Sequence, residues 1–253
     1  MLKTFENTVY LDAQRYDDEY WWKTNDLEFW KRMLRESSGN KVLEIAAGTG
    51  RIAIPLVREG ANYTGLELSK QFVNQANQKL KNHQFDTKIV QGDMRDFNLN
   101  EKYDLIFIGF NSFLHLLNDD DANLFFQSVK KHMHENTKFI IDIFTPNPLM
   151  LYRPENMKFY VMEYVDSITN AKTVIEESNI YDTETNINQL TWHYIAEGSD
   201  DIKTMNFFMR MYWPDTMNRL LIDAGFEIEE FWGDYNNAEF DEESILQIYV
   251  CKI

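Results

Sequence analysis

The stretch VLEIAAGTGRIAIPL, residues 42–56, decides the fold that we expect for this chain. It places a short apolar strand, a turn with Gly48 and Gly50, and an apolar helix directly after one another. Glycine in such a turn lets the backbone approach a ligand closely, and the N–H groups at the start of the helix point toward it. The spacing Gly48-x-Gly50-x-x-Ala53 also fits the dinucleotide fingerprint. The stretch alone is therefore compatible with a turn that binds a nicotinamide dinucleotide or another adenosine, and with a tight turn between strand and helix that binds no ligand.

Apolar strands and amphipathic helices alternate around this stretch. Leu27, Trp30 and Leu34 recur at helical spacing before it. After it come the apolar runs NYTGLEL (62–68), TKIVQGD (87–93), YDLIFIGF (103–110) and KFIIDIF (138–144). Apolar strands that alternate with helices are typical of a parallel sheet covered on both faces. We therefore predict an α/β fold.

The pattern changes after residue 146 and returns near residue 213. Residues 157–212 alternate polar and apolar side chains between turn-like stretches, which predicts an insertion of about four antiparallel strands. A helix then begins at Pro214 and ends near Gly225, and two apolar runs close the chain. We predict one domain over residues 1–253. Its parts are a helical N-terminal segment (1–38), a core (41–146), a β-rich insertion (155–212), and a last helix with two strands (213–253).

Composition narrows the classes of function. The 253 residues carry 41 acidic against 25 basic side chains, a formal net charge of −16, so we expect no nucleic acid and no anionic membrane as partner. There is no signal-peptide pattern and no run of about 18 apolar residues. The single cysteine, Cys251, excludes a disulfide within the chain. We expect a cytoplasmic protein, as a monomer or a homodimer.

Acidic and polar residues stand where the predicted strands end. Glu67 ends the second strand, 19 residues after Gly48, where a carboxylate can accept both hydroxyls of a ribose. Asp93 follows the third strand and offers an acceptor for an adenine amino group, with the N–H of Met94 beside it. Phe110 and Asn111 end the fourth strand. Because the carboxyl ends of parallel strands meet at one edge, we expect these residues to share a site.

These motifs together resemble the class I S-adenosylmethionine-dependent methyltransferases over nearly the whole chain. The matching motifs are VLEIAAGTG, GLELS, QGDMRDF and YDLIFIGFNSF. GLELS, GDMRDF and FNSFLHL are similar to the small-molecule branch that contains aminosugar N,N-dimethyltransferases. The resemblance implies a Rossmann-like sheet of seven strands with an antiparallel last strand. It also implies that the insertion lies over the acceptor site and that the N-terminal helices form a lid with it.

The resemblance implies S-adenosylmethionine as cofactor and S-adenosylhomocysteine as product. Amino and carboxylate groups of the cofactor would lie near the glycine turn and the Phe110 carbonyl, Leu68 would pack on adenine, and Tyr16 would cover the methionine end. Glu44, in the strand before the turn, would repel a pyrophosphate but suits a sulfonium and an ammonium group. The residues expected to bind the cofactor are Tyr16, Glu44, Ala46, Gly48, Gly50, Glu67, Leu68, Asp93, Met94, Phe110 and Asn111. An NAD-dependent oxidoreductase and a non-catalytic module are the alternatives.

Methyl transfer is an in-line displacement in which proximity supplies most of the rate. His115 is the candidate base, because the resemblance places it facing the acceptor and an imidazole titrates near neutral pH. The acceptor is expected to be a small molecule with a nitrogen or oxygen nucleophile. Candidate substrate contacts are Trp21, His193, Tyr212 and Tyr235. His132 and His134 are expected to be solvated, and no ligand spacing predicts a metal.

Overall fold

The computed structural model describes residues 8–253, which form two compact units. The α/β unit contains Thr24–Thr145 and Tyr212–Ile253. The insertion unit contains the described residues up to Lys23 together with Pro146–Met211. Residues 8–23 of the predicted N-terminal segment thus group with the insertion, and residues 24–38 with the sheet.

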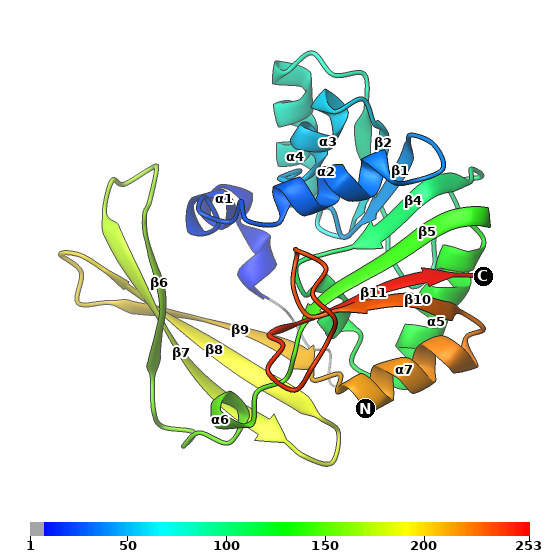
Figure 1. Ribbon diagram of the computed structural model, residues 1–253. Coiled ribbons are helices and arrows are strands. Elements are labelled where there is room, and N and C mark those ends of the chain that lie inside the picture. The colour runs from blue at the N-terminus through cyan, green and yellow to red at the C-terminus, as the bar shows by residue number, and fades with distance from the viewer. Residues whose placement is uncertain (1–7) are drawn as a thin grey trace. The chain divides into compact units, whose positions relative to one another are not determined.

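Among the described residues, seven strands form the sheet of the α/β unit in the order β10-β11-β5-β4-β1-β2-β3 (Figure 1). Strands β1 to β5 pair in parallel, and β11 runs antiparallel to both of its neighbours. The bounds are β1 Lys41–Ile45, β2 Asn62–Glu67, β3 Lys88–Gln91, β4 Tyr103–Ile108, β5 Met133–Phe144, β10 Glu227–Trp232 and β11 Leu246–Lys252. The predicted Rossmann-like fold, with its antiparallel last strand, is confirmed.

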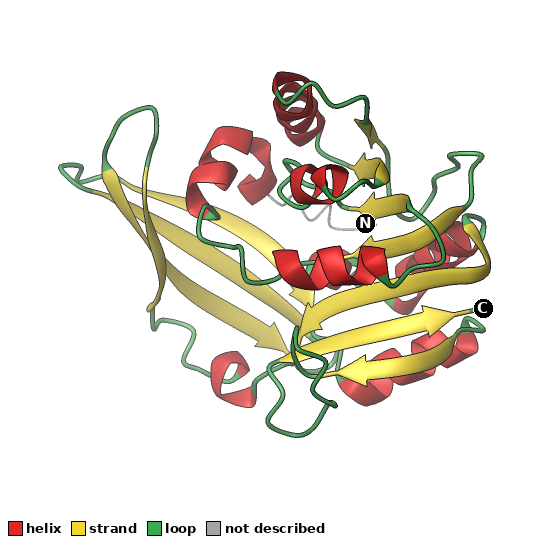
Figure 2. Ribbon diagram, turned by 45° about the horizontal axis from the view of Figure 1, so that its top comes forward, coloured by secondary structure: helices red, strands yellow, loops and turns green. Residues whose placement is uncertain are grey.

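Helices cover both faces of this sheet (Figures 1 and 2). The helices α2 (Leu27–Arg35), α3 (Ala53–Arg58) and α4 (Lys70–Asn82) lie on one face, and α5 (Asp119–Lys130) and α7 (Pro214–Asp223) lie on the other. Side chains cap two of them, because Ser69 accepts from the N–H of Phe72 and Asn118 from that of Asp121. A short 3₁₀ helix, η2 (Ser112–His115), follows β4.

The core explains why the central strands are apolar along their whole length. Leu105, Ile106 and Phe107 of β4 are fully buried, because helices lie above and below the sheet. The Trp30 ring of α2 stacks on Phe107 with 4.2 Å between ring centroids. Each such buried ring contributes about 1.5–3 kcal/mol of transfer free energy. The amphipathic helix that the sequence predicts over 27–34 is therefore fixed to the sheet by its apolar face.

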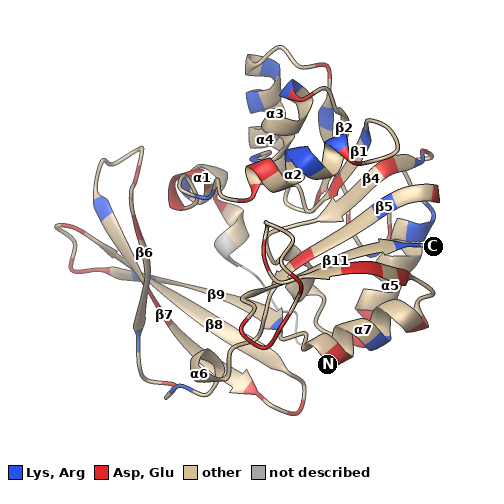
Figure 3. Cartoon of the chain, in the orientation of Figure 1, with Lys and Arg blue, Asp and Glu red and all other residues tan. Residues whose placement is uncertain are grey.

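The insertion unit is an antiparallel sheet with short helices. Its sheet has the order β6-β7-β8-β9, which confirms the predicted insertion of about four strands. Ile175, Trp192 and Phe207 are buried on one face of this sheet. The bounds are η1 Thr8–Leu11, α1 Ala13–Glu19, α6 Pro148–Leu151, β6 Phe159–Val165, β7 Lys172–Asp182, β8 Ile187–Ala196 and β9 Ile202–Arg210. Acidic side chains outnumber basic ones in the chain and occur on elements of both units (Figure 3).

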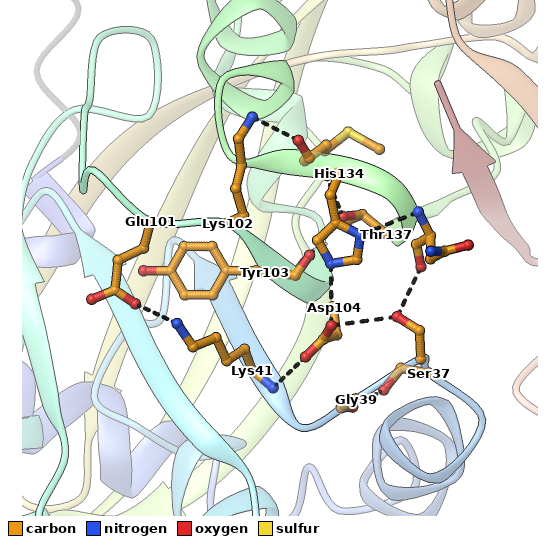
Figure 4. A network of polar contacts seen from close by, with 12 residues as sticks. Ser37, Gly39, Lys41, Glu101, Lys102, Tyr103, Asp104, His134 and Thr137 are labelled. Carbon is orange, nitrogen blue, oxygen red and sulfur yellow. Dashed lines mark hydrogen bonds and ion pairs between the residues drawn. The ribbon is translucent and has the colours of Figure 1, made fainter.

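The amino edge of the α/β sheet is closed by a polar network around Asp104 (Figure 4). The Asp104 carboxylate accepts from the N–H of Lys41 at 2.9 Å and lies 3.1 Å from Nε2 of His134. A Cβ on Gly39 would lie 2.4 Å from Asp104 Oδ2, so a larger residue at this position would displace the carboxylate. The network joins the starts of β1, β4 and β5, so the polar groups of this edge stabilise the sheet.

His132 and His134 correct a prediction, because the described structure holds both in hydrogen bonds. His132 is buried, with Nδ1 2.7 Å from the Ser128 carbonyl oxygen and Nε2 accepting from the N–H of Leu99. Its ring also stacks on Phe97. Burial lowers the pKa of His132, and both ring nitrogens are used by the neutral imidazole. The β5 strand begins at Met133, so His134 is part of the sheet and His132 lies in the turn between α5 and β5.

The lowered pKa of His132 predicts a pH-dependent stability. A buried neutral histidine stabilises the fold above its unfolded pKa, about 6.5, and this stability is lost as the pH falls through the lower folded pKa. The His132→Gln variant should therefore differ from the wild type by about 1–3 kcal/mol at pH 8 and by much less at pH 5. Urea unfolding at both pH values measures this difference.

The control is Val250→Ala, which removes buried apolar atoms of β11 and changes no titratable group. Its difference from the wild type should be equal at the two pH values. A constant difference for His132→Gln as well would contradict the role of His132.

Candidate active site at the carboxyl edge

The turn after β1 has an unusual backbone. Ala46, Gly48 and Gly50 all have positive φ, at 57°, 58° and 82°. No atom within 4 Å would meet a Cβ on Gly48, so glycine is needed there for its conformation and not for space. Ala46 adopts the same left-handed region at a cost of about 1 kcal/mol. Strain of this kind is typical of a turn that is shaped to hold a ligand.

Glu67 ties this turn to the end of β2. Its Oε2 accepts from the N–H of Gly48 at 2.9 Å, and its Oε1 accepts from the N–H of Ser69 at 2.8 Å. Burial raises the pKa of Glu67, and the two backbone donors act against that shift. Each carboxylate oxygen keeps a further lone pair, which matches the two hydroxyls of a ribose. The neighbouring Leu68 is 64% exposed, as a side chain that packs on a ligand ring would be.

Glu44 lies in β1, under the turn. The Tyr63 hydroxyl donates to its Oε2 at 2.5 Å, and the residue is buried. Burial raises the pKa of Glu44 to about 8, although Tyr63 and the charge of Arg51 oppose the shift. Glu44 therefore carries a proton at neutral pH in this structure. This changes the sequence-based picture of an anion before the turn, because at neutral pH a cation beside Glu44 would favour its ionised form.

Asp93 stands at the end of β3 in a different environment. Its Oδ2 lies 2.6 Å from Nη2 of Arg95, and its Oδ1 accepts from the N–H of the same residue at 2.9 Å. The hydrogen bonds from Arg95 lower the pKa of Asp93, so this carboxylate is ionised. Arg95 also contacts Asp121 of α5, which fixes the loop. Met94 stands between Asp93 and Arg95 in the sequence and is half-buried.

The chain after β4 forms a second strained turn. Phe110 and Asn111 have positive φ, at 51° and 66°. Asp142 near the end of β5 accepts from the N–H of Phe110 at 3.1 Å through Oδ2 and from that of Asn111 at 3.2 Å through its carbonyl. Asn111 Oδ1 in turn accepts from the N–H of Phe144 at 2.7 Å. The two neighbouring strand ends are thereby joined.

Three ionisable side chains at this edge were not predicted from the sequence, namely two buried acids and a half-buried arginine. Asp26, at the start of α2, holds Arg51 through two contacts of 2.6 and 2.8 Å. The Arg51 guanidinium lies 5.4 Å from the centroid of the Phe110 ring, a cation–π distance. Asp142 is the third of these side chains and is 2% exposed. The sequence held a signal for two of them, since Arg51 follows the glycine turn directly and Asp142 interrupts an apolar strand.

The structure places His115 beside the second turn and corrects the role of Tyr212. His115 ends η2 and is half-buried between the buried side chains of Leu114 and Leu116. Tyr212 was predicted to contact substrate, but it is fully buried and its hydroxyl donates to the Leu116 carbonyl. Tyr212 therefore holds the backbone next to His115. Tyr235 is half-buried, and its hydroxyl donates to Asp142 Oδ2 at 3.0 Å.

The other predicted contacts belong to the insertion unit. Tyr16 lies in α1 with its ring centroid 4.6 Å from that of Tyr20. Trp21 is 71% exposed. His193 lies in β8, where Nε2 is 3.0 Å from Ser178 Oγ and burial lowers the pKa of its imidazole. The roles of these residues stay predictions.

Among residues 8–253, no group of three or more His, Cys, Asp or Glu side chains is arranged to hold a metal ion. No helix formed by those residues has both the length and the apolar character to cross a membrane.

Comparison with known proteins shows what this chain is similar to. A family model described as "Methyltransferase domain" matches residues 42–136, the part of the chain that carries both turns. An aminosugar N,N-dimethyltransferase of Streptomyces venezuelae, which acts on dTDP-3-amino-3,4,6-trideoxy-alpha-D-glucopyranose, is 27% identical over 43% of this chain and 44% of its own length. A glycine/sarcosine N-methyltransferase of Aphanothece halophytica is 23% identical over 95% of this chain and 87% of its own.

Solved structures share the fold over the whole chain. The CcbJ methyltransferase from Streptomyces caelestis superposes with a TM-score of 0.83 at 20% identity, covering 98% of this chain and 99% of that one. The domain match confirms the prediction of a methyltransferase and gives no support to the oxidoreductase alternative.

Proposed function

We propose that this methyltransferase transfers a methyl group from S-adenosylmethionine to an amine nitrogen of a small molecule. The observation that carries the proposal is the pair of hydrogen bonds from Gly48 and Ser69 to Glu67. They leave acceptor positions for a ribose at the end of β2, directly beside the glycine turn. Two relatives that act on amines support nitrogen over oxygen as the nucleophile. A cytoplasmic location and a monomeric or homodimeric state remain predictions.

The residues present fit a nucleoside without phosphates better than a dinucleotide. In a dinucleotide fold, the N–H groups of this turn bind a pyrophosphate. Here the N–H of Gly48 is occupied by the Glu67 carboxylate. A pyrophosphate would be repelled at this place, whereas a positively charged ligand would be attracted.

We assign each part of the cofactor to one part of this edge. Glu67 would accept from the ribose hydroxyls, Asp93 and the N–H of Met94 would contact the adenine edge, and Leu68 would pack on its face. The Phe110 carbonyl and the turn at Ala46 would hold the amino acid end. The sulfonium of S-adenosylmethionine supplies the methyl group in a form that leaves readily. The protein therefore has to bind, align and exclude water.

His115 would supply the one proton transfer that an amine needs. An aliphatic amine arrives as an ammonium ion at pH 7 and has no free lone pair, so a base must accept its proton. His115 follows the second turn by a few residues and is half-buried. An imidazole is matched to this task because its pKa lies near neutral pH.

Replacing Glu67 or Asp93 should weaken binding of the cofactor. Glu67→Gln and Asp93→Ala each remove charged hydrogen bonds worth about 1–3 kcal/mol, or about 5- to 150-fold in Kd. Titration calorimetry with S-adenosylhomocysteine measures the effect. Glu101→Ala, at the exposed amino edge, is the matched control and should bind like the wild type. Wild-type affinity in both test variants would refute the assignment.

Binding of a cation beside Glu44 should release its proton. The pKa of about 8 means that Glu44 is protonated at pH 7, and a positive ligand lowers that pKa. Calorimetry with S-adenosylmethionine at pH 7, in buffers of different ionisation enthalpy, should show release that approaches one proton. Glu44→Gln should abolish this release, whereas Tyr63→Phe should keep it. Equal release by Glu44→Gln and the wild type would show that the proton comes from elsewhere.

Replacing His115 should separate binding from turnover. His115→Ala should keep the wild-type Kd for S-adenosylhomocysteine and lower kcat by about 10²-fold or more, the usual contribution of a general base. The acceptor comes from a screen of amines, aminosugars and phenols for methylated product. His83→Ala, at the exposed end of α4, is the control. Unchanged turnover in His115→Ala would reduce His115 to a packing role.

A further inference from the structure

The Phe110–Asn111 turn is held from two sides by groups outside its own strand. Two consecutive residues other than glycine in the left-handed region are strained, and such a turn persists only where its surroundings fix it. The hydrogen bonds to Asp142 and Phe144 fix it from β5. The Arg51 guanidinium lies over the Phe110 ring.

Asp142 is an unfavourable residue for a buried strand end. Its neighbours Ile141 and Ile143 are fully buried, and a carboxylate in such a place loses its hydration. Asp142 Oδ2 recovers hydrogen bonds from the N–H of Phe110 and from the Tyr235 hydroxyl. An apolar residue would avoid this desolvation but would leave both donors without their acceptor. The Asp142 carboxylate is therefore needed as the acceptor for the N–H of Phe110 and the hydroxyl of Tyr235.

Tyr235 is itself anchored to α2. The Arg32 guanidinium donates to the Tyr235 carbonyl at 2.7 Å, and the Tyr235 ring lies 5.4 Å from that of Phe29. Burial raises the pKa of the Tyr235 hydroxyl, so it stays protonated and acts as a donor. The loop after β10 thus carries a continuous connection from α2 through Tyr235 and Asp142 to the backbone of Phe110.

We propose that Asp142 and Tyr235 are positioning residues for methyl transfer, which together hold the Phe110–Asn111 turn in its active geometry. This inference rests on the proposed function. The turn carries the Phe110 carbonyl at one end and leads into η2 with His115 at the other. Tyr212 already fixes the far end through the Leu116 carbonyl. Asp142 and Tyr235 fix the near end, so the segment 110–116 is held at both ends.

The test compares two phenol-to-phenyl substitutions. Tyr235→Phe removes only the hydroxyl that contacts Asp142. Tyr103→Phe is the matched control, because it removes a buried hydroxyl that bonds Thr64 and lies at the amino edge of the same sheet. Asp142→Asn is a second test variant, which keeps an acceptor oxygen but not the charge.

Three measurements are made on each full-length variant. Hydrogen–deuterium exchange of residues 110–116 should become at least about tenfold faster in Tyr235→Phe and stay at the wild-type rate in Tyr103→Phe. With the acceptor found by screening, kcat should fall about tenfold in Tyr235→Phe, with the acceptor KM changed by less than about threefold. The Kd for S-adenosylhomocysteine should rise about threefold or more. Tyr103→Phe should keep all three values within about twofold.

The outcomes separate this inference from the proposed function. Binding of S-adenosylhomocysteine and methyl release by the wild type test the function, whereas the ratios between variants test the inference. Wild-type exchange of residues 110–116 in Tyr235→Phe overturns the inference, and so does an equal loss of kcat in Tyr235→Phe and Tyr103→Phe. If Asp142→Asn does not fold, the Tyr235→Phe result decides.

Discussion

Both oxygens of the Glu67 carboxylate accept backbone N–H groups, one from the glycine turn and one from the start of the next loop. This interaction joins the carboxyl ends of β1 and β2 and fixes the backbone that a nucleoside must approach. It also uses an N–H that a phosphate would otherwise bind. We propose that this contact favours a ligand with ribose hydroxyls and without phosphates, because the N–H of Gly48 cannot bind Glu67 and a phosphate at once.

The two edges of the sheet use their polar groups in different ways. At the amino edge, the Asp104 carboxylate and the imidazole of His134 satisfy each other and the strand starts (Figure 4). At the carboxyl edge, polar groups are buried beside strained turns at Ala46 and Phe110. Parallel strands place all their carboxyl ends on one side of the sheet, so a ligand that binds there contacts several loops at once. The buried acids Glu44, Glu67 and Asp142 accordingly lie at the edge that we assign to the cofactor.

The acids of this edge differ in charge although they are similar in sequence. Glu44 is buried against a phenol and is neutral near pH 7, whereas Asp93 is held by a guanidinium and is ionised. Local surroundings set these states, through desolvation in the first case and hydrogen bonding in the second. A site with one protonatable acid close to the turn can adjust its charge to a cationic ligand. A site built only from ionised carboxylates would lack that adjustment.

The sequence by itself determined the order of strands and helices, the antiparallel insertion and the glycine turn, because hydrophobic period and turn chemistry are local properties of the chain. It also placed Glu67, Asp93 and Phe110 at strand ends. Only the tertiary structure decided where side chains from distant segments point. It paired Asp26 with Arg51 and Tyr235 with Asp142. It also placed the Tyr212 hydroxyl against the Leu116 carbonyl and the His132 ring against the Ser128 carbonyl. The hydrophobic period of the sequence gives no signal for any of these contacts. Their physical reason is that burial and hydrogen-bond satisfaction depend on the packing of whole elements, which spacing along one strand does not contain.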